Sequence, residues 1–290
     1  MIEKLIIGTV QFGIDYGITN STGKINQNEL DHIFNFCNNN NINYFDTAQD
    51  YGNSEDIMSN YNKIYSNINI ITKSKFKNKN IEDVINISLN KFNYIECFLL
   101  HSFEDYQNKE LINTLLKYKK LNKIKKIGVS IYNVEEGIKL LEDNIIDVIQ
   151  IPFNYLDNQW FNDKFQNLIS INNYIEIHVR SIFLQGLLLN KPQKYPLNIS
   201  KEDFDYLENI ILEICKNLNL TKLELCFSYI NSFEWINKFL IGIDNLDHLK
   251  LNFNIINKNL KLNKDEIIFI NDKVKNINKD ILNPTKWIFN

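Results

Sequence analysis

The chain has 290 residues and a formal net charge of -3, with 44% hydrophobic and 23% charged residues. This composition is typical of a globular protein with a sizeable core, and it argues against a disordered chain. The slightly acidic balance gives no general attraction to nucleic acid or to an anionic membrane surface, and no apolar run approaches the roughly 18 residues of a membrane span.

The cysteines and the N-terminus bear on the cellular compartment. Four cysteines lie far apart, without a CxxC or Cys/His cluster, at Cys37, Cys97, Cys215 and Cys226. This spacing predicts reduced thiols, and it favours neither a disulfide framework nor a zinc site. The first residues, MIEKLIIGTVQFG, do not resemble a secretory signal. We therefore expect a cytoplasmic protein without a bound metal. Asparagine is abundant, which we interpret as coding bias.

Short apolar runs alternate along the chain with longer segments of helical period. The expected strands are residues 5–9, 43–47, 69–72, 96–101, 125–130, 147–154, 174–181 and 238–243. Apolar residues recur at steps of three and four in the intervening segments 29–40, 81–92, 109–121 and 134–144. This alternation predicts strands that are each followed by a helix.

The ends of these strands recur at a nearly constant interval. Successive ends lie 24 to 29 residues apart, at Asp46, Lys73, His101, Ser130, Asn154 and Ser181. Such a period fits a strand, a loop and a helix of three turns, and eight units predict a (β/α)8 TIM barrel. The longer interval before Gly242 predicts a helical insertion at about 200–232 within a single domain, 1–290, with a short C-terminal tail. A doubly wound sheet would have fewer units and usually a GxGxxG motif, which the chain lacks.

Three consecutive strands end in residues that could act together. Asp46, Lys73 and His101 end these strands, and Tyr51 follows in the first loop. Each has a simpler explanation alone, such as a turn for Asp46, but strand ends of a barrel meet on one face. A lysine beside a tyrosine favours the phenolate, and a paired carboxylate keeps the ammonium charged. We therefore expect a phenol that exchanges its proton near neutral pH and an imidazole that orients a carbonyl oxygen.

The chain resembles the aldo-keto reductase family. The segment FDTAQDYGNSE follows the pattern F-D-T-A-x-x-Y-G-x-S-E, and IITKS, LLHS, GVS, QIPFNYLD and RSIFLQGLL follow in the family's order. The resemblance covers about residues 5–257 and implies reduction of an aldehyde or ketone, with hydride supplied by NADPH or NADH. It implies that Tyr51 is the general acid, that Lys73 and Asp46 tune it, and that His101 orients the substrate.

The same resemblance implies a nucleotide site on the barrel face. The implied contacts are Thr9, Ser130, Gln150, Arg180, Ser181, Gln185, Gly186, Gly242, Asp244, His248 and Asn252. Ser130 and Gln150 match positions that hold the carboxamide, and residues 181–186 match the loop around the pyrophosphate. Arg180 stands where many members stack a tyrosine on the nicotinamide. NADP-preferring members carry basic residues near the start of the last helix, where this chain has Gly242, Asp244, Asn245 and His248, so we expect no strict preference for NADPH.

Two segments indicate a subgroup. GTVQFGIDYGITNSTGKI and VRSIFLQGLLL are similar to a bacterial branch associated with surface-polysaccharide and activated-sugar pathways. This similarity concerns the pathway context and not the chemistry, and our leading hypothesis for the small carbonyl substrate is a sugar or sugar derivative. Two alternatives stay open, namely a nucleotide-binding sensor or scaffold with little turnover, and a lyase or epimerase that uses bound cofactor transiently. No nucleic-acid or membrane partner is expected, and the oligomeric state is left open.

Overall fold

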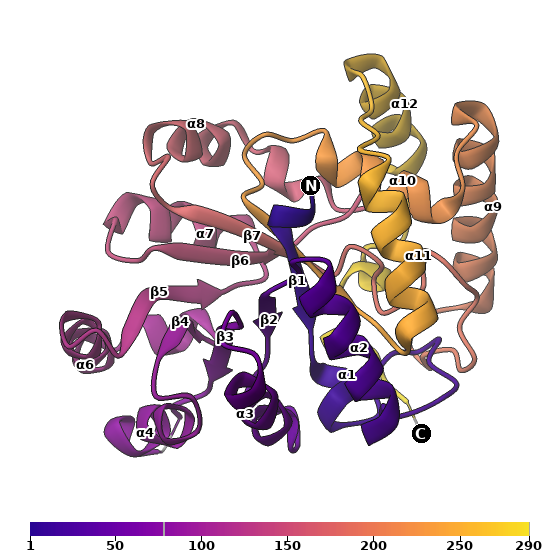
Figure 1. Ribbon diagram of the computed structural model, residues 1–290. Coiled ribbons are helices and arrows are strands. Elements are labelled where there is room, and N and C mark those ends of the chain that lie inside the picture. The colour runs from indigo at the N-terminus through magenta and orange to yellow at the C-terminus, as the bar shows by residue number, and fades with distance from the viewer. Residues whose placement is uncertain (78, 290) are drawn as a thin grey trace.

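The computed structural model describes residues 1–77 and 79–289. Eight parallel strands form a closed barrel in sequence order, as the sequence predicts (Figure 1). They are β1 (Leu5–Gly8), β2 (Tyr44–Asp46), β3 (Asn69–Ser74), β4 (Ile95–Leu100), β5 (Ile124–Ser130), β6 (Val148–Pro152), β7 (Glu176–Arg180) and β8 (Lys238–Gly242). Strand β8 closes on β1, with Gly242 opposite Gly8. The single-domain (β/α)8 fold is therefore confirmed.

Helices surround the strands as an outer layer (Figure 1). The longer ones are α2 (Gln27–Asn39), α3 (Ser54–Ile64), α4 (Ile81–Phe92), α6 (Lys109–Lys120), α7 (Val134–Asp143), α8 (Asp163–Ile171), α9 (Lys201–Leu218), α10 (Lys222–Asn231), α11 (Leu246–Asn257) and α12 (Lys264–Val274). Short helices α1 (Val10–Gly13) and α5 (Phe103–Tyr106) follow β1 and β4. Both α9 and α10 occupy the long interval between β7 and β8. None of the described helices is both long and apolar enough to cross a membrane.

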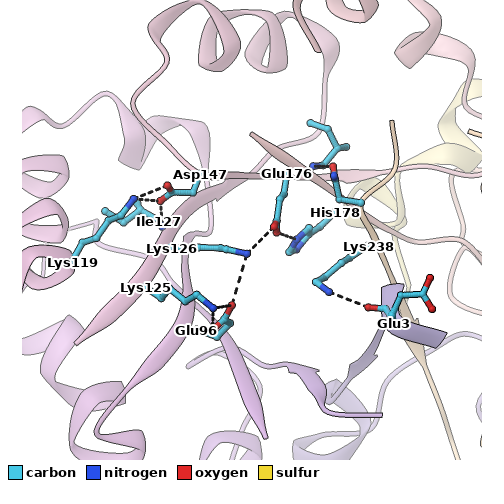
Figure 2. A network of polar contacts seen from close by, with 12 residues as sticks. Glu3, Glu96, Lys119, Lys125, Lys126, Ile127, Asp147, Glu176, His178 and Lys238 are labelled. Atoms are coloured by element: carbon cyan, nitrogen blue, oxygen red, sulfur yellow. Dashed lines mark hydrogen bonds and ion pairs between the residues drawn. The ribbon is translucent and has the colours of Figure 1, made fainter. Parts of the chain in front are cut away.

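The barrel interior is closed at its N-terminal end by charged side chains. An apolar layer of Ile6, Ile71, Cys97, Leu99 and Val148 fills the middle of the barrel. Below it, Figure 2 shows Lys126, Glu176 and His178 pointing toward one another. The Lys126 ammonium lies 2.7 Å from one carboxylate oxygen of Glu176, and the other oxygen lies 3.0 Å from Nε2 of His178. These contacts join β5 to β7 at the N-terminal end of the barrel. A ligand site is therefore expected at the opposite face, where the C-terminal ends of the strands lie.

Candidate active site

A cavity of about 640 Å³ opens at the C-terminal ends of the strands. Every residue that the sequence predicts for the site lines it: Thr9, Asp46, Tyr51, Lys73, His101, Ser130, Gln150, Arg180, Ser181, Gln185, Gly186, Gly242, Asp244, His248 and Asn252. These residues come from all eight strands or the segments that follow them. The barrel therefore brings together residues as far apart in the chain as Thr9 and Asn252.

A buried ion pair lies at the reactive end of the cavity. The Lys73 ammonium contacts one carboxylate oxygen of Asp46, and both side chains are almost completely buried. The other oxygen of Asp46 accepts a hydrogen bond of 2.9 Å from the amide nitrogen of Gln150. The amide oxygen of Gln150 is buried and has no partner among the described residues. It can therefore accept a hydrogen bond from a ligand.

Tyr51 lies over this ion pair. The centre of its ring is 5.3 Å from the Lys73 ammonium and 6.4 Å from the centre of the His101 ring, which it meets edge to face. Its hydroxyl forms no hydrogen bond with any of the side chains described. The phenol therefore lines the cavity between a cation and an imidazole, with its proton available to a ligand.

Two glycines hold the loop that carries Tyr51. A Cβ atom on Gly13 would lie 1.7 Å from the carbonyl oxygen of Tyr51, so only glycine fits there. Gly52 has a φ of +56°, in the left-handed region, and its own Cβ would lie 2.6 Å from the carbonyl oxygen of Gly13. The backbones of the loops after β1 and β2 therefore pack directly against each other at these glycines, and this contact fixes the position of the phenol.

Other residues of the FDTAQDYGNSE segment support the loop from behind. Ser54 donates to the carbonyl of Thr9 at 2.9 Å, and its hydroxyl lies 2.7 Å from the hydroxyl of Thr9. The Thr9 hydroxyl also donates to the carbonyl of Asp46. Thr9, which the sequence predicts to bind the nucleotide, therefore uses its hydroxyl in contacts within the protein. Glu55 accepts hydrogen bonds of 2.7 Å from Thr72 and Ser88, which tie α3 to β3 and α4. The sequence reasoning missed this structural role of Ser54 and Glu55.

The titration of the site differs in one respect from the expectation. Burial, and then the negative charge of Asp46, raise the pKa of Tyr51 above its usual range. Burial also lowers the pKa of Lys73, against the opposing effect of Asp46. The expectation of a phenol that titrates close to neutral pH does not hold for this state, because burial, the largest effect, and the charge of Asp46 both raise the pKa of Tyr51. Burial, and then the charge of Lys73, lower the pKa of His101 to about 3, so its imidazole is neutral at pH 7.

Arg180 lies between the reactive end and the loop after β7. Its guanidinium stacks on the ring of Tyr132, with 4.3 Å between the guanidinium carbon and the ring centre. Tyr132, Tyr16 and Lys75 also line the cavity, and the sequence reasoning did not single them out. Tyr132 lies two residues after Ser130, and this closeness to a strand end was the available signal.

The far end of the cavity lies beside the start of α11. The His248 imidazole lies 3.5 Å from the Asp244 carboxylate, and the hydrogen bond with Asp244 raises the pKa of His248. The amide nitrogen of Gln11 donates to Asp244 at 3.4 Å, while its buried oxygen has no partner among the described residues. A side chain at Gly242 would meet this amide at 2.7 Å. Glycine at the end of β8 therefore leaves room for Gln11 to reach the cavity.

The loop after β7 has an unusual backbone. Positive φ angles occur at Ser181, Leu184, Gln185 and Gly186. Gly186 packs against Thr19, whose hydroxyl would lie 1.8 Å from a Cβ atom at that position. The loop thus lies closely against the loop after β1, and Ser181, Gln185 and Gly186 face the same cavity as Asp244.

Comparison with solved structures shows the same fold. A protein from Pseudomonas aeruginosa assigned as an aldo-keto reductase shares 20% identity, with 89% of this chain and 91% of that chain covered and a TM-score of 0.65. The holo form of an aldo-keto reductase from Bacillus halodurans shares 19% identity, with 93% and 91% covered and a TM-score of 0.73. Comparison with curated protein sequences gives no significant match. The sequence model of the aldo/keto reductase family matches residues 4–275. The chain therefore belongs to the aldo-keto reductase family, whose members are oxidoreductases that use NAD(P)H to reduce carbonyl groups.

Proposed function

We propose that this protein reduces an aldehyde or ketone with NADPH or NADH and that Tyr51 is the general acid. The observation that carries the proposal is the position of the Tyr51 phenol, which lines the cavity beside the buried Lys73–Asp46 pair and the neutral imidazole of His101. Its hydroxyl has no partner among the described residues and is free to donate to a ligand. This arrangement suits proton delivery to a carbonyl oxygen.

The orphaned acceptors of the cavity fit a nicotinamide nucleotide. The buried amide oxygen of Gln150 needs a donor, which a carboxamide N–H would supply, and the Ser130 hydroxyl lies at the neighbouring strand end. Gln11 offers a second orphaned amide oxygen near Asp244, at the other end of the cavity. When bound, the reduced nicotinamide supplies the hydride and its two electrons, which no side chain can supply.

Side chains of the protein supply the proton, stabilise the phenolate and orient the carbonyl oxygen. The raised pKa of Tyr51 keeps its proton in place until the carbonyl oxygen becomes basic, and the proton then moves from the phenol to that oxygen to give the alcohol. The Lys73 ammonium stabilises the phenolate that remains, and water returns the proton afterwards. The neutral His101 can donate one N–H to the same oxygen and so orient it.

Aromatic side chains around the reactive end support a sugar or sugar derivative as substrate. Tyr16 and Tyr132 line the cavity and are 40% and 38% exposed. Each ring offers an apolar face and a hydroxyl, a combination that suits the C–H faces and hydroxyl groups of a sugar.

The experiment that tests this function follows the loss of absorbance of NADH or NADPH with a panel of aldehydes, keto sugars and nucleotide-linked sugars. We expect turnover of at least one class, and intrinsic fluorescence quenching by both nucleotides. Binding of nucleotide without turnover of any carbonyl would favour a sensor or scaffold. A product with unchanged oxidation state and no net consumption of nucleotide would favour a lyase or epimerase.

A further inference from the structure

The chain contains 32 lysine and arginine residues in total, and Arg180 is the only arginine among them. A guanidinium differs from an ammonium in its planar fork of five N–H donors, which matches the oxygens of a carboxylate or phosphate. The single arginine lies at the end of β7 and lines the cavity.

The contacts of Arg180 orient its guanidinium and leave its charge without a partner. Nε donates to the Ser130 hydroxyl at 3.4 Å, Nη1 to the Ser181 hydroxyl at 3.3 Å, and Nη2 to the carbonyl of Ile131 at 3.2 Å. All three acceptors are neutral and all three contacts are long. No carboxylate of residues 1–77 or 79–289 pairs with it. With five donors and three bonds, the fork keeps capacity for a ligand.

The other charges at this end of the cavity cancel. Lys73 is paired with Asp46, and Lys75 lies 3.1 Å from Asp50. His101 is neutral at pH 7, because burial lowers its pKa. The guanidinium of Arg180 is therefore the uncompensated charge at the reactive end, as far as the described residues go. A half-buried cation held against Tyr132 attracts an anion more strongly than one on an open surface.

We infer that Arg180 binds an anionic oxygen group of the carbonyl substrate, so that the enzyme acts on acidic aldehydes or ketones that carry a carboxylate or a phosphate. The guanidinium reaches toward the end of β5, and β5 pairs with β4, which precedes His101. Tyr132, on which the guanidinium stacks, also follows β5, whereas Asp244 and α11 follow β8. This inference rests on the proposed function, because it assigns a substrate class to the same site.

The test compares matched substrates at saturating nucleotide. The carboxylate pair is succinic semialdehyde and butanal, and the phosphate pair is glyceraldehyde 3-phosphate and glyceraldehyde. We expect kcat/KM to favour the anionic member of at least one pair by about 10- to 100-fold, because charge-assisted hydrogen bonds to the guanidinium would stabilise its binding. The pair that shows the preference identifies the anion. Both members use the same bound nucleotide, so the ratio is insensitive to nucleotide affinity.

Three variants make the test specific to the guanidinium. Arg180→Met should reduce the preference to within about threefold of unity, and Arg180→Lys should retain only part of it, because lysine lacks the fork. Lys109→Met removes the same formal charge from an exposed position on α6 and should keep the wild-type ratio. Nucleotide affinity of each variant is measured separately by fluorescence.

The outcomes separate this inference from the proposed function. If wild type reduces both members of each pair equally well, or if Arg180→Met keeps the preference, the inference is overturned and the reductase stands. If no carbonyl is reduced, the proposed function fails. Calorimetry then measures whether the nucleotide-saturated protein binds an anionic ligand through Arg180. Binding of 4-hydroxybutyrate or glycerol 3-phosphate, lost in Arg180→Met and absent for butanol and glycerol, would support the inference. Equal binding by wild type and Arg180→Met, or no binding by wild type, would overturn it.

Discussion

The Lys73 ammonium and the Asp46 carboxylate face each other with only 2% and 3% of their side-chain surfaces exposed. Breaking such a pair leaves an uncompensated buried charge. We expect Asp46→Asn to lower the free energy of unfolding by about 3–5 kcal/mol, measured by urea denaturation. The matched control is Asp50→Asn, which breaks the pair with Lys75, where both side chains are more than a third exposed and the expected loss is below about 1 kcal/mol. Equal losses in the two variants would show that burial does not strengthen the first pair.

Asp244 is the residue expected to influence the choice of nucleotide. Its carboxylate lies beside Gln11 and His248 where α11 begins, and a second negative charge there would be disfavoured. We expect Kd values for NADH and NADPH within about tenfold of each other in wild type. Asp244→Asn should shift the ratio toward NADPH by about 1 kcal/mol, roughly fivefold, in a fluorescence titration. An unchanged ratio would place the 2′-phosphate away from Asp244.

Asparagine has a structural role at the ends of the helices. An asparagine side chain caps the N-termini of seven of the longer helices, at Asn26, Asn80, Asn108, Asn133, Asn162, Asn245 and Asn263. Asparagines with positive φ follow or end helices at Asn41, Asn93, Asn122, Asn144, Asn219 and Asn259. Both positions favour asparagine for physical reasons, because its short side chain bonds the free N–H groups and tolerates the left-handed region. The interpretation as coding bias alone was therefore incomplete.

The cap of α12 offers a test away from the cavity. Asn263 accepts a hydrogen bond of 3.0 Å from the backbone N–H of Glu266, and the Glu266 side chain accepts one from the backbone of Asn263. We expect Asn263→Ala to cost about 1 kcal/mol of unfolding free energy, and Asn263→Asp to cost much less, because aspartate keeps the acceptor. Urea midpoints measure both. A loss of equal size in the two variants would contradict the capping role.

The elements and the site differ in how far the sequence predicts them. The strands and the segment around Tyr51 were predictable, because buried strands are apolar runs and the period of the barrel repeats along the chain. The contact between Arg180 and Tyr132 was not, because it joins two loops without periodicity and depends on side-chain orientation. The direction of the Tyr51 pKa was also missed, since it depends on burial that no sequence pattern reports.

Buried histidines at the two ends of the barrel make the stability of the molecule depend on pH. Burial lowers the pKa of His178 at the N-terminal end, and burial, with a smaller effect of Lys73, lowers that of His101 to about 3 at the other end. In the unfolded chain both histidines take up protons near their usual value of 6.5, so the folded state binds fewer protons below that pH. The stability that these two histidines contribute is therefore fully present above pH 6.5 and falls as the pH drops.

Thermal unfolding between about pH 8 and about pH 5 measures this effect. We expect a nearly constant midpoint at the upper end and a progressive fall below the histidine value, with a shallower fall in His178→Gln. A midpoint that rises on acidification, or a His178→Gln curve parallel to that of wild type, would rule out a buried neutral His178 as a source of the dependence.

The most direct test of the whole account is a single-turnover experiment on wild type and Tyr51→Phe with a carbonyl substrate identified by the panel. Removing the general acid should slow hydride transfer by about 10²–10⁴-fold, because the oxygen loses its proton donor. The Kd for NADH and NADPH should stay within about threefold of wild type, since the hydroxyl forms no hydrogen bond that holds the described fold together. Equal transfer rates in the two proteins, with nucleotide bound to both, would contradict the assignment of Tyr51 and the mechanism built on it.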